Sequence, residues 1–202
     1  MERENHFEPK DSFSALQLLR EGNRRYVTGK TSFPPDYSKE RPNLAENGQH
    51  PFAIILGCSD SRVPPEIVFD QGLGRLFTVR TAGNVADAIA IGSVEYAAQH
   101  LNVLLIVVLG HQKCGAVAAA VSGGDHGPNI NAIIKEIQPS LKKILSTSGK
   151  NIECRCEDEN IRHTASKLRE SEIISKLMYD KKLTIVGAKY NIETGEVSFG
   201  ID

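Results

Sequence analysis

The chain has 202 residues, of which 40% are hydrophobic and 24% are charged, and its formal net charge at pH 7 is −1. These values are typical of one globular domain with a single sizeable core. The balance of charge argues against a protein that binds nucleic acid or an anionic membrane surface. The longest aliphatic run, residues 103–109, has seven residues, and a bilayer-spanning helix needs roughly 20.

The charged residues are unevenly distributed along the chain. Residues 51–134 hold ten of them, whereas residues 1–50 hold 16 and residues 135–202 hold 23. We therefore expect the middle segment to supply the core and an intersubunit surface. The charged N-terminus lacks the apolar stretch of a secretory signal, so we expect a cytoplasmic protein. The chain has four cysteines, and in that reducing compartment cysteines near His and Asp are expected to be metal ligands or nucleophiles before disulfides.

The first predicted element is an amphipathic helix over residues 12–28. Its apolar residues recur at helical spacing, Asp11 or Ser12 can cap its start, and Gly29 can end it. The polar segment 31–50 contains three prolines. It predicts a long surface connection that wraps around something, without a packed element of its own.

Four short aliphatic runs without alternation predict strands that are covered on both faces, as in a parallel sheet. They lie at residues 53–56, 76–79, 103–109 and 183–186. Helical patterns separate them, and the alternation predicts an α/β fold with a doubly wound, mainly parallel sheet. A turn signal after the fourth run allows a short antiparallel edge strand. The predicted helices cover residues around 91–101, 130–145 with a bend near Pro139, and 159–179, and the edge strand covers residues 197–199.

The most reactive side chains follow two of these predicted strands. Cys58 comes directly after the first run, and His111 and Cys114 come directly after the third. Ligands in open α/β sheets bind just beyond the carboxyl ends of the strands. Two thiols and an imidazole at such a place fit a zinc site. His111 and Cys114 are close enough in sequence to chelate together, so the metal would join two loops.

Three ligands leave one tetrahedral position, which marks a catalytic site if water takes it and a structural site if the protein fills it. Asp60 is the candidate to fill it, and Arg62 offers a competing partner for the same carboxylate. We therefore expect two states. Either Asp60 binds the metal and excludes water, or it pairs with Arg62 and can hold a bound water by a hydrogen bond.

Plainer interpretations stay open at this stage. The zinc can be purely structural, the Asp60–Arg62 pair can be an ordinary salt bridge, and Cys58 can be a core cysteine. Cys58 can also be a nucleophile served by His111 without any metal. The joint occurrence of all five residues favours the catalytic metal site over each of these alternatives.

These residues resemble the paired signature of the β-class carbonic anhydrases. The signature is carried by Cys58-Ser59-Asp60-Ser61-Arg62-Val63-Pro64 together with His111-x-x-Cys114-Gly115. The resemblance covers most of residues 51–120 and resumes weakly at Asn160-x-x-His163 and at residues 186–190. It implies zinc, one per subunit, held by Cys58, His111 and Cys114. It also implies that Asp60 and Arg62 form a dyad that orients or releases the fourth ligand.

The resemblance further implies a Rossmann-like sheet of about four parallel strands plus an edge strand, flanked by helices. Residues 1–50 would form an N-terminal helical arm and wrapping loop that embraces a partner, and residues 51–202 the zinc-containing catalytic part of a single domain. A homodimer or a dimer of dimers would result. The implied reaction is the reversible hydration of carbon dioxide to bicarbonate and a proton by zinc-bound hydroxide. Hydrolysis of carbonyl sulfide or carbon disulfide on the same scaffold, or a non-catalytic structural-zinc module, are the alternatives.

Several residues depart from the family pattern or stand outside it. Arg75 occupies a position that is usually acidic, and the chain has no tryptophan. Gln71 is a candidate to bind substrate, although it lies one residue out of register. His163 can be a proton shuttle, but a helix-packing role is favoured. The Cys154-Arg155-Cys156 segment can bind a soft metal, but an exposed variable loop is favoured.

Overall fold

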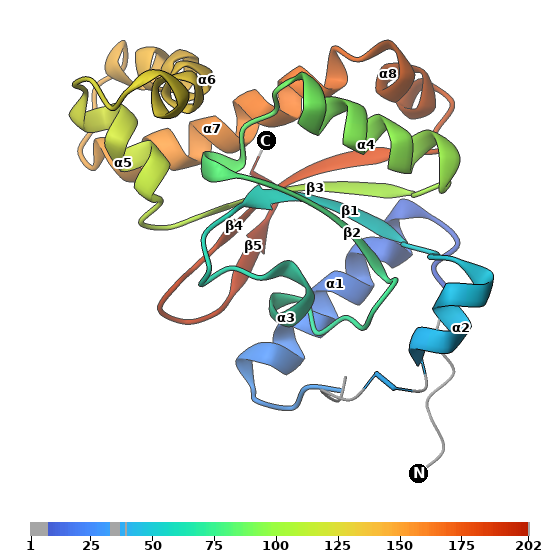
Figure 1. The fold of residues 1–202 in the computed structure, drawn as a ribbon. Coiled ribbons are helices and arrows are strands. Elements are labelled where there is room, and N and C mark those ends of the chain that lie inside the picture. Colours follow the sequence, from blue (N-terminus) through green and yellow to red (C-terminus); the bar gives the residue numbers. More distant parts are fainter. Residues whose placement is uncertain (1–7, 33–36, 39, 202) are drawn as a thin grey trace.

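In the computed structural model, which describes residues 8–32, 37–38 and 40–201, the chain forms a five-stranded sheet of order β2-β1-β3-β4-β5 with helices on both faces (Figure 1). Four strands are parallel, and β5 runs antiparallel to β4 at one edge. The predicted α/β class and the mainly parallel sheet with an edge strand are therefore confirmed. The strands are β1 Ala53–Cys58, β2 Leu76–Thr81, β3 Leu105–His111, β4 Thr184–Tyr190 and β5 Val197–Phe199.

The strands extend further towards their carboxyl ends than the aliphatic runs do. β3 begins two residues later than predicted and continues through Gly110 to His111. β4 continues past the predicted residue 186 because Lys189 and Tyr190 pair with this end of β3. Since these positions are polar, the apolar pattern stops before the strands do. The extension places His111 within the sheet.

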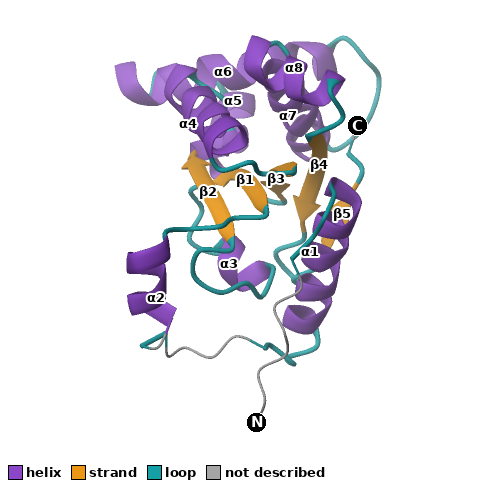
Figure 2. Ribbon diagram, turned by 90° about the vertical axis from the view of Figure 1, so that its right-hand side faces the viewer, coloured by secondary structure: helices purple, strands orange, loops and turns teal. Residues whose placement is uncertain are grey.

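Successive residues of the central strands point to opposite faces of the sheet. Ile54 and Ile106 pack with residues of α4 (Ala88–His100), α7 (Ile152–Arg169) and α8 (Glu172–Tyr179). Ile55 and Val107 pack on the other face with α1 (Ser12–Val27) and the end of α3 (Pro65–Val68). Figures 1 and 2 show these two layers of helices with the sheet between them. Burial on both faces explains why β1 and β3 are continuous aliphatic runs.

The N-terminal helix α1 begins as predicted. Asp11 caps it, since its carboxylate accepts the Ser14 N–H at 2.7 Å while the Ser14 hydroxyl accepts the Asp11 N–H at 3.2 Å. Ala15 and Leu19 are fully buried against the sheet of the same chain. Contact of this arm with a partner stays a prediction.

Two sequence predictions about helices are corrected. The connection over residues 31–50 contains a helix that was not expected, although none of the described residues of that helix is buried. The predicted helix over residues 159–179 is wrong as a single helix, because Ser171 interrupts it and its hydroxyl accepts the Ile174 N–H to start α8. The remaining helices are α2 Glu40–Asn47, α5 Gly115–Ser122, α6 Pro128–Leu145 and the short 3₁₀ helix η1 Ala82–Asn84.

The expected exposed loop around Cys154 and Cys156 is also wrong, because α7 begins at Ile152 and includes both cysteines. Cys156 is fully buried, whereas Cys154 is exposed. The buried face of α7 carries polar residues such as Glu157 and Asn160, so apolar periodicity revealed the helix only from residue 159 and missed its first two turns. Among the described residues, no helix is long and apolar enough to cross a membrane.

Gly22 marks a close approach between α1 and the chain after α3. A Cβ atom at this position would lie 1.8 Å from the Phe69 carbonyl oxygen. We expect Gly22→Ala to lower the free energy of unfolding by at least about 1–3 kcal/mol, because backbone would have to move. Gly92→Ala is the matched control, since a Cβ there meets no atom within 4 Å, and it should gain up to about 1 kcal/mol. Urea unfolding of both variants checks this, and equal midpoints would contradict the close packing.

Candidate metal centre

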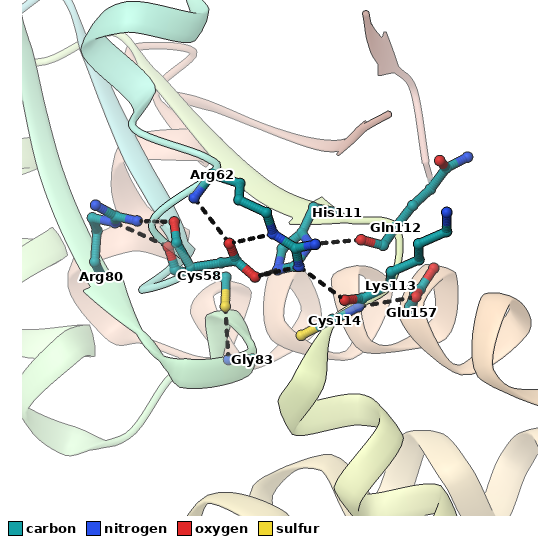
Figure 3. A network of polar contacts seen from close by, with 10 residues as sticks. Cys58, Arg62, Arg80, Gly83, His111, Gln112, Lys113, Cys114 and Glu157 are labelled. Carbon is teal, nitrogen blue, oxygen red and sulfur yellow. Dashed lines mark hydrogen bonds and ion pairs between the residues drawn. The ribbon is translucent and has the colours of Figure 1, made fainter. Parts of the chain in front are cut away.

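Three side chains of the metal-binding types meet where β1 and β3 end (Figure 3). The ligand atoms of Cys58, His111 and Cys114 all lie within 4.8 Å of one another, and all three residues are buried. β1 and β3 are neighbours at the point where the strand order reverses, which is where open α/β sheets form their ligand crevice. In the part of the chain that the structure describes, this is the one cluster of at least three such residues.

The end of β3 and the loop that follows it orient His111 and Cys114. The His111 Nδ1 lies 2.8 Å from the Gln112 carbonyl oxygen, so the ring presents Nε2 to the cluster. Lys113 adopts a left-handed backbone conformation with φ 56°. Cys114 then becomes the N-cap of α5, and the Val117 and Ala116 N–H groups of the first turn favour its thiolate.

The His111 Nε2 atom carries the clearest sign of a missing ligand. It is buried and has no hydrogen-bond partner among the described residues, and the nearby Asp60 Oδ2 lies 3.8 Å away. Buried polar nitrogens are almost always bonded. A metal ion between this nitrogen and the two sulfurs would satisfy it. The donor set of two sulfurs and one imidazole nitrogen suits zinc and leaves one tetrahedral position open. The residues present therefore fit the metal that the resemblance implies.

The two thiols and the imidazole strongly influence one another. Interaction with the Cys114 thiol lowers the pKa of Cys58 to about 4, even though burial opposes its ionisation. The same interaction, with burial, raises the pKa of Cys114. Burial opposes protonation of His111, but the neighbouring Cys58 sulfur and the Gln112 carbonyl raise its pKa. The cluster thus shares protons that a bound metal would displace, because metal ligands must be deprotonated.

Asp60 and Arg62 form a two-point ion pair beside the cluster. The Arg62 Nε and Nη2 donate to the two Asp60 carboxylate oxygens at 2.9 and 2.7 Å, and the Arg62 backbone N–H donates at 2.9 Å. Hydrogen bonding from Arg62 holds the pKa of Asp60 well below its usual range. Arg62 also donates to the Lys113 carbonyl at 3.3 Å. Of the two expected positions of Asp60, the structure shows the one paired with Arg62.

Two residues that the sequence analysis did not assign to the site hold its first loop. Arg80 at the end of β2 donates to the Cys58 carbonyl at 2.9 Å and to the Asp60 carbonyl at 2.6 Å. The Gly83 N–H donates to the Cys58 sulfur at 3.2 Å. Arg80 lies near the carboxyl end of β2, and Gly83 follows that strand. Because β2 neighbours β1, their position at the same sheet edge was the signal that could have found them.

The other candidates lie apart from this cluster. Gln71 is buried, and its amide donates to the Phe69 carbonyl at 3.0 Å. His163 lines a hollow beside α6 together with Pro139, and its packing and shuttle roles stay predictions. Arg75 pairs with Glu8 of the same chain, and its guanidinium lies 5.0 Å from the centre of the Phe52 ring.

Comparison with known proteins now decides the family. The sequence profile described as "Carbonic anhydrase" matches residues 53–197. A solved structure titled "The structure of the beta-carbonic anhydrase CcaA" superposes with a TM-score of 0.73 at 28% identity, covering 92% of this chain and 87% of that one. The chain belongs to the β-class carbonic anhydrase family. Members of this family are carbonate dehydratases, so the chain is an enzyme.

Two relatives named carbonic anhydrase are similar to this chain over nearly their whole length. "Carbonic anhydrase 2" of Mycobacterium tuberculosis is 40% identical over 186 residues, which are 90% of this chain and 89% of that protein. "Carbonic anhydrase" of Mycolicibacterium smegmatis is 39% identical over 189 residues, 91% of each chain. The similarity therefore extends beyond residues 53–197.

Proposed function

We propose that the protein is a zinc-dependent carbonic anhydrase that interconverts carbon dioxide and water with bicarbonate and a proton. The observation that carries the proposal is the buried cluster of Cys58, His111 and Cys114, with its unpartnered imidazole nitrogen beside an ionised carboxylate. These three residues would hold the zinc. When bound, the zinc would supply a Lewis acid that lowers the pKa of a water molecule towards neutrality.

Asp60 is the proposed catalytic residue, and Arg62 positions it. Its Oδ1 accepts two hydrogen bonds from Arg62, whereas Oδ2 accepts one and faces His111 Nε2 at 3.8 Å. Oδ2 therefore keeps the capacity to accept a hydrogen bond from the reacting water. Since Arg62 keeps the carboxylate ionised, Asp60 accepts in this geometry and does not donate. It would orient the water so that an oxygen lone pair points at the carbon of the substrate.

The surroundings of the cluster suit a small nonpolar substrate. Cys58 and Cys114 are members of an apolar cluster that includes Val85, Val117 and Ile137. Carbon dioxide has no net charge or dipole for polar side chains to recognise, so an apolar wall beside a polar reacting centre fits it. Carbonyl sulfide and carbon disulfide are linear electrophiles of similar shape, and the three ligands alone do not separate these substrates.

The proposal is tested by measuring zinc content and reaction rate on the same preparation. We expect about one zinc per chain and rapid hydration of carbon dioxide in a stopped-flow assay, both lost together on chelation. Zinc at that level without hydration would indicate the structural-zinc module. Carbonyl sulfide, assayed side by side, should react more slowly. Faster turnover of carbonyl sulfide would make the protein a hydrolase for that substrate.

The remaining parts of the proposal concern assembly and location. We propose a homodimer or dimer of dimers, because large apolar side chains such as Ile89, Phe13 and Tyr96 are exposed at 80%, 69% and 52%. Light scattering after size exclusion would measure the mass of the assembly.

We also propose a cytoplasmic location, because the four free cysteines fit the reducing cytoplasm. Gln71 remains a candidate to contact substrate.

A further inference from the structure

We propose that α7 positions the metal centre through one stripe of buried side chains. The stripe contacts the Cys114 backbone, the residue before His111, and the turn whose Gly83 N–H donates to the Cys58 sulfur. The inference rests on the proposed centre at Cys58, His111 and Cys114. Members of the stripe are spaced by one, three or four residues along the helix, so they share one face. None is more than 6% exposed. They are Glu157, Asn160, Ile161 and Thr164.

Glu157 holds the residue that supplies the second thiol. Its Oε1 accepts the Cys114 N–H at 3.3 Å, as Figure 3 shows. Its Oε2 lies 2.9 Å from the ammonium group of Lys189, which is itself only 11% exposed and also binds Asp158 at 2.7 Å. A buried N–H without a partner costs about 1–3 kcal/mol. Glu157 thus satisfies and aims the Cys114 backbone, and Lys189 balances the buried carboxylate beside the thiols.

Asn160 holds the turn that contacts the first thiol. Its amide donates to the Gly83 carbonyl at 2.7 Å, and the Gly83 N–H in turn donates to the Cys58 sulfur at 3.2 Å. Gly83 has a φ of +72°, and a Cβ there would lie 2.9 Å from Ile137, so the turn favours glycine. Thr164 adds a hydrogen bond of 3.1 Å to the carbonyl of the next residue, Asn84. The turn is therefore fixed to α7 at two successive carbonyl groups.

Ile161 sets the position of the third ligand by packing. A Cβ atom on Gly110 would lie 2.6 Å from two carbon atoms of the Ile161 side chain. Gly110 directly precedes His111 in β3. The missing side chain lets α7 approach the strand closely, so the distance between α7 and this end of β3 depends on Ile161.

Ordinary helix packing would explain why this stripe is buried. It would not explain why the contacts of the stripe fall on residues next to the three proposed ligands. Two polar contacts and one apolar contact reach the Cys114 backbone, the turn at Cys58 and the residue before His111. Residues that support metal ligands in this way typically change metal affinity or activity about 10–100-fold when they are mutated. A role in positioning and a role in packing therefore differ in a measurable quantity, the retention of the metal.

The test measures zinc transfer from the full-length protein to a chromogenic chelator. We expect Glu157→Ala and Asn160→Ala to release zinc about 10–100-fold faster than the wild type and to shift the thiolate-to-metal absorption band of the cobalt(II) protein. Glu157→Gln keeps an acceptor for the Cys114 N–H, so its release rate should rise by less than about tenfold. Asp158→Asn is the matched control, because Asp158 shares Lys189 with Glu157 but is outside the ligand contacts named above. Its release rate and spectrum should match the wild type.

Several outcomes would overturn the inference. Folded alanine variants that release zinc at the wild-type rate with an unchanged cobalt spectrum would leave α7 a packing helix only. If the alanine variants do not fold, the nearly isosteric Asn160→Asp takes their place, because it removes the donor to the Gly83 carbonyl. Zinc release from Asn160→Asp that is no faster than from Glu157→Gln would equally refute the proposal. A wild-type chain that binds no zinc would refute the proposed centre and this inference with it, whereas a zinc-loaded wild type confines any failure to α7.

Discussion

Cys58→Ser is expected to abolish both zinc binding and hydration of carbon dioxide. Cys58 is the one proposed ligand from β1, and the metal would join that strand to the two ligands at and after the end of β3. A serine hydroxyl stays protonated at neutral pH and does not replace a thiolate on zinc. The loss of metal affinity should exceed the roughly 10–100-fold typical of residues that only support a ligand.

The same substitution should also remove the stabilisation that metal binding gives to the folded state. A ligand present at about 1,000 times its Kd stabilises the fold by about 4 kcal/mol. Wild-type protein should therefore melt at a higher temperature with zinc than without it, and Cys58→Ser should melt at the same temperature in both conditions. Differential scanning calorimetry and metal analysis of the dialysed protein give the two readouts.

Cys154→Ser is the matched control for this experiment. Cys154 is exposed on α7, and its sulfur lies 3.5 Å from the Lys189 ammonium group. The control exchanges the same atoms outside the cluster, so zinc content and activity should stay at wild-type levels. If Cys58→Ser retains a full complement of zinc, the metal site is elsewhere or Cys58 is a core cysteine.

The contrast between these two cysteines shows what sequence alone could predict. Cys58 follows an aliphatic run, and the carboxyl end of a parallel strand is where chemistry is expected, so its place in a site could be predicted from sequence. Cys154 and Cys156 had no such context. They belong to a helix whose buried face includes Glu157, Glu159, Asn160 and Thr164, and a polar buried face gives no hydrophobic period.

Sequence patterns could not show which backbone atoms Asn160 and Arg80 contact. Asn160 contacts the Gly83 carbonyl from 77 positions away, and Arg80 contacts the Cys58 carbonyl from 22 positions away. A carbonyl oxygen has the same chemistry in every residue, so the residue types in a sequence do not indicate which carbonyl group a side chain will contact. The Asp60–Arg62 pair was predictable because two side chains of opposite charge lie two positions apart. Sequence alone could not decide whether the Asp60 carboxylate pairs with Arg62 or takes the metal position, because both partners are within its reach.

Asp60→Asn is expected to leave zinc in place and reduce the hydration rate by about 10²–10⁴-fold, the range typical of a group that acts on protons in the transition state. The substitution keeps the shape but removes the charge that Arg62 holds through two side-chain hydrogen bonds of 2.9 and 2.7 Å. An amide would turn its NH₂ group towards either Arg62 or the reacting water. In either orientation, the neutral amide cannot accept hydrogen bonds from Arg62 and from the reacting water at the same time, as the two carboxylate oxygens do.

Arg62→Ala tests the positioning half of the same pair. The Asp60 Oδ2 atom lies 3.8 Å from His111 Nε2. Without the guanidinium, the Asp60 carboxylate is free to move closer to the three ligands and to occupy the fourth position of the metal site. We expect turnover to fall while zinc becomes harder to remove. Adding Asp60→Ala to this variant should make zinc as easy to remove as in the wild type.

Glu193→Gln is the control for charge alone. It makes the same acid-to-amide change in an exposed pair with Lys113, where both side chains are about two-thirds exposed, and such pairs contribute little. Its hydration rate should match the wild type. Stopped-flow assays and metal analysis of Asp60→Asn separate the remaining outcomes. Loss of zinc from this variant would make the carboxylate a structural ligand. Full activity of this variant with full zinc would reduce the Asp60–Arg62 pair to an ordinary salt bridge.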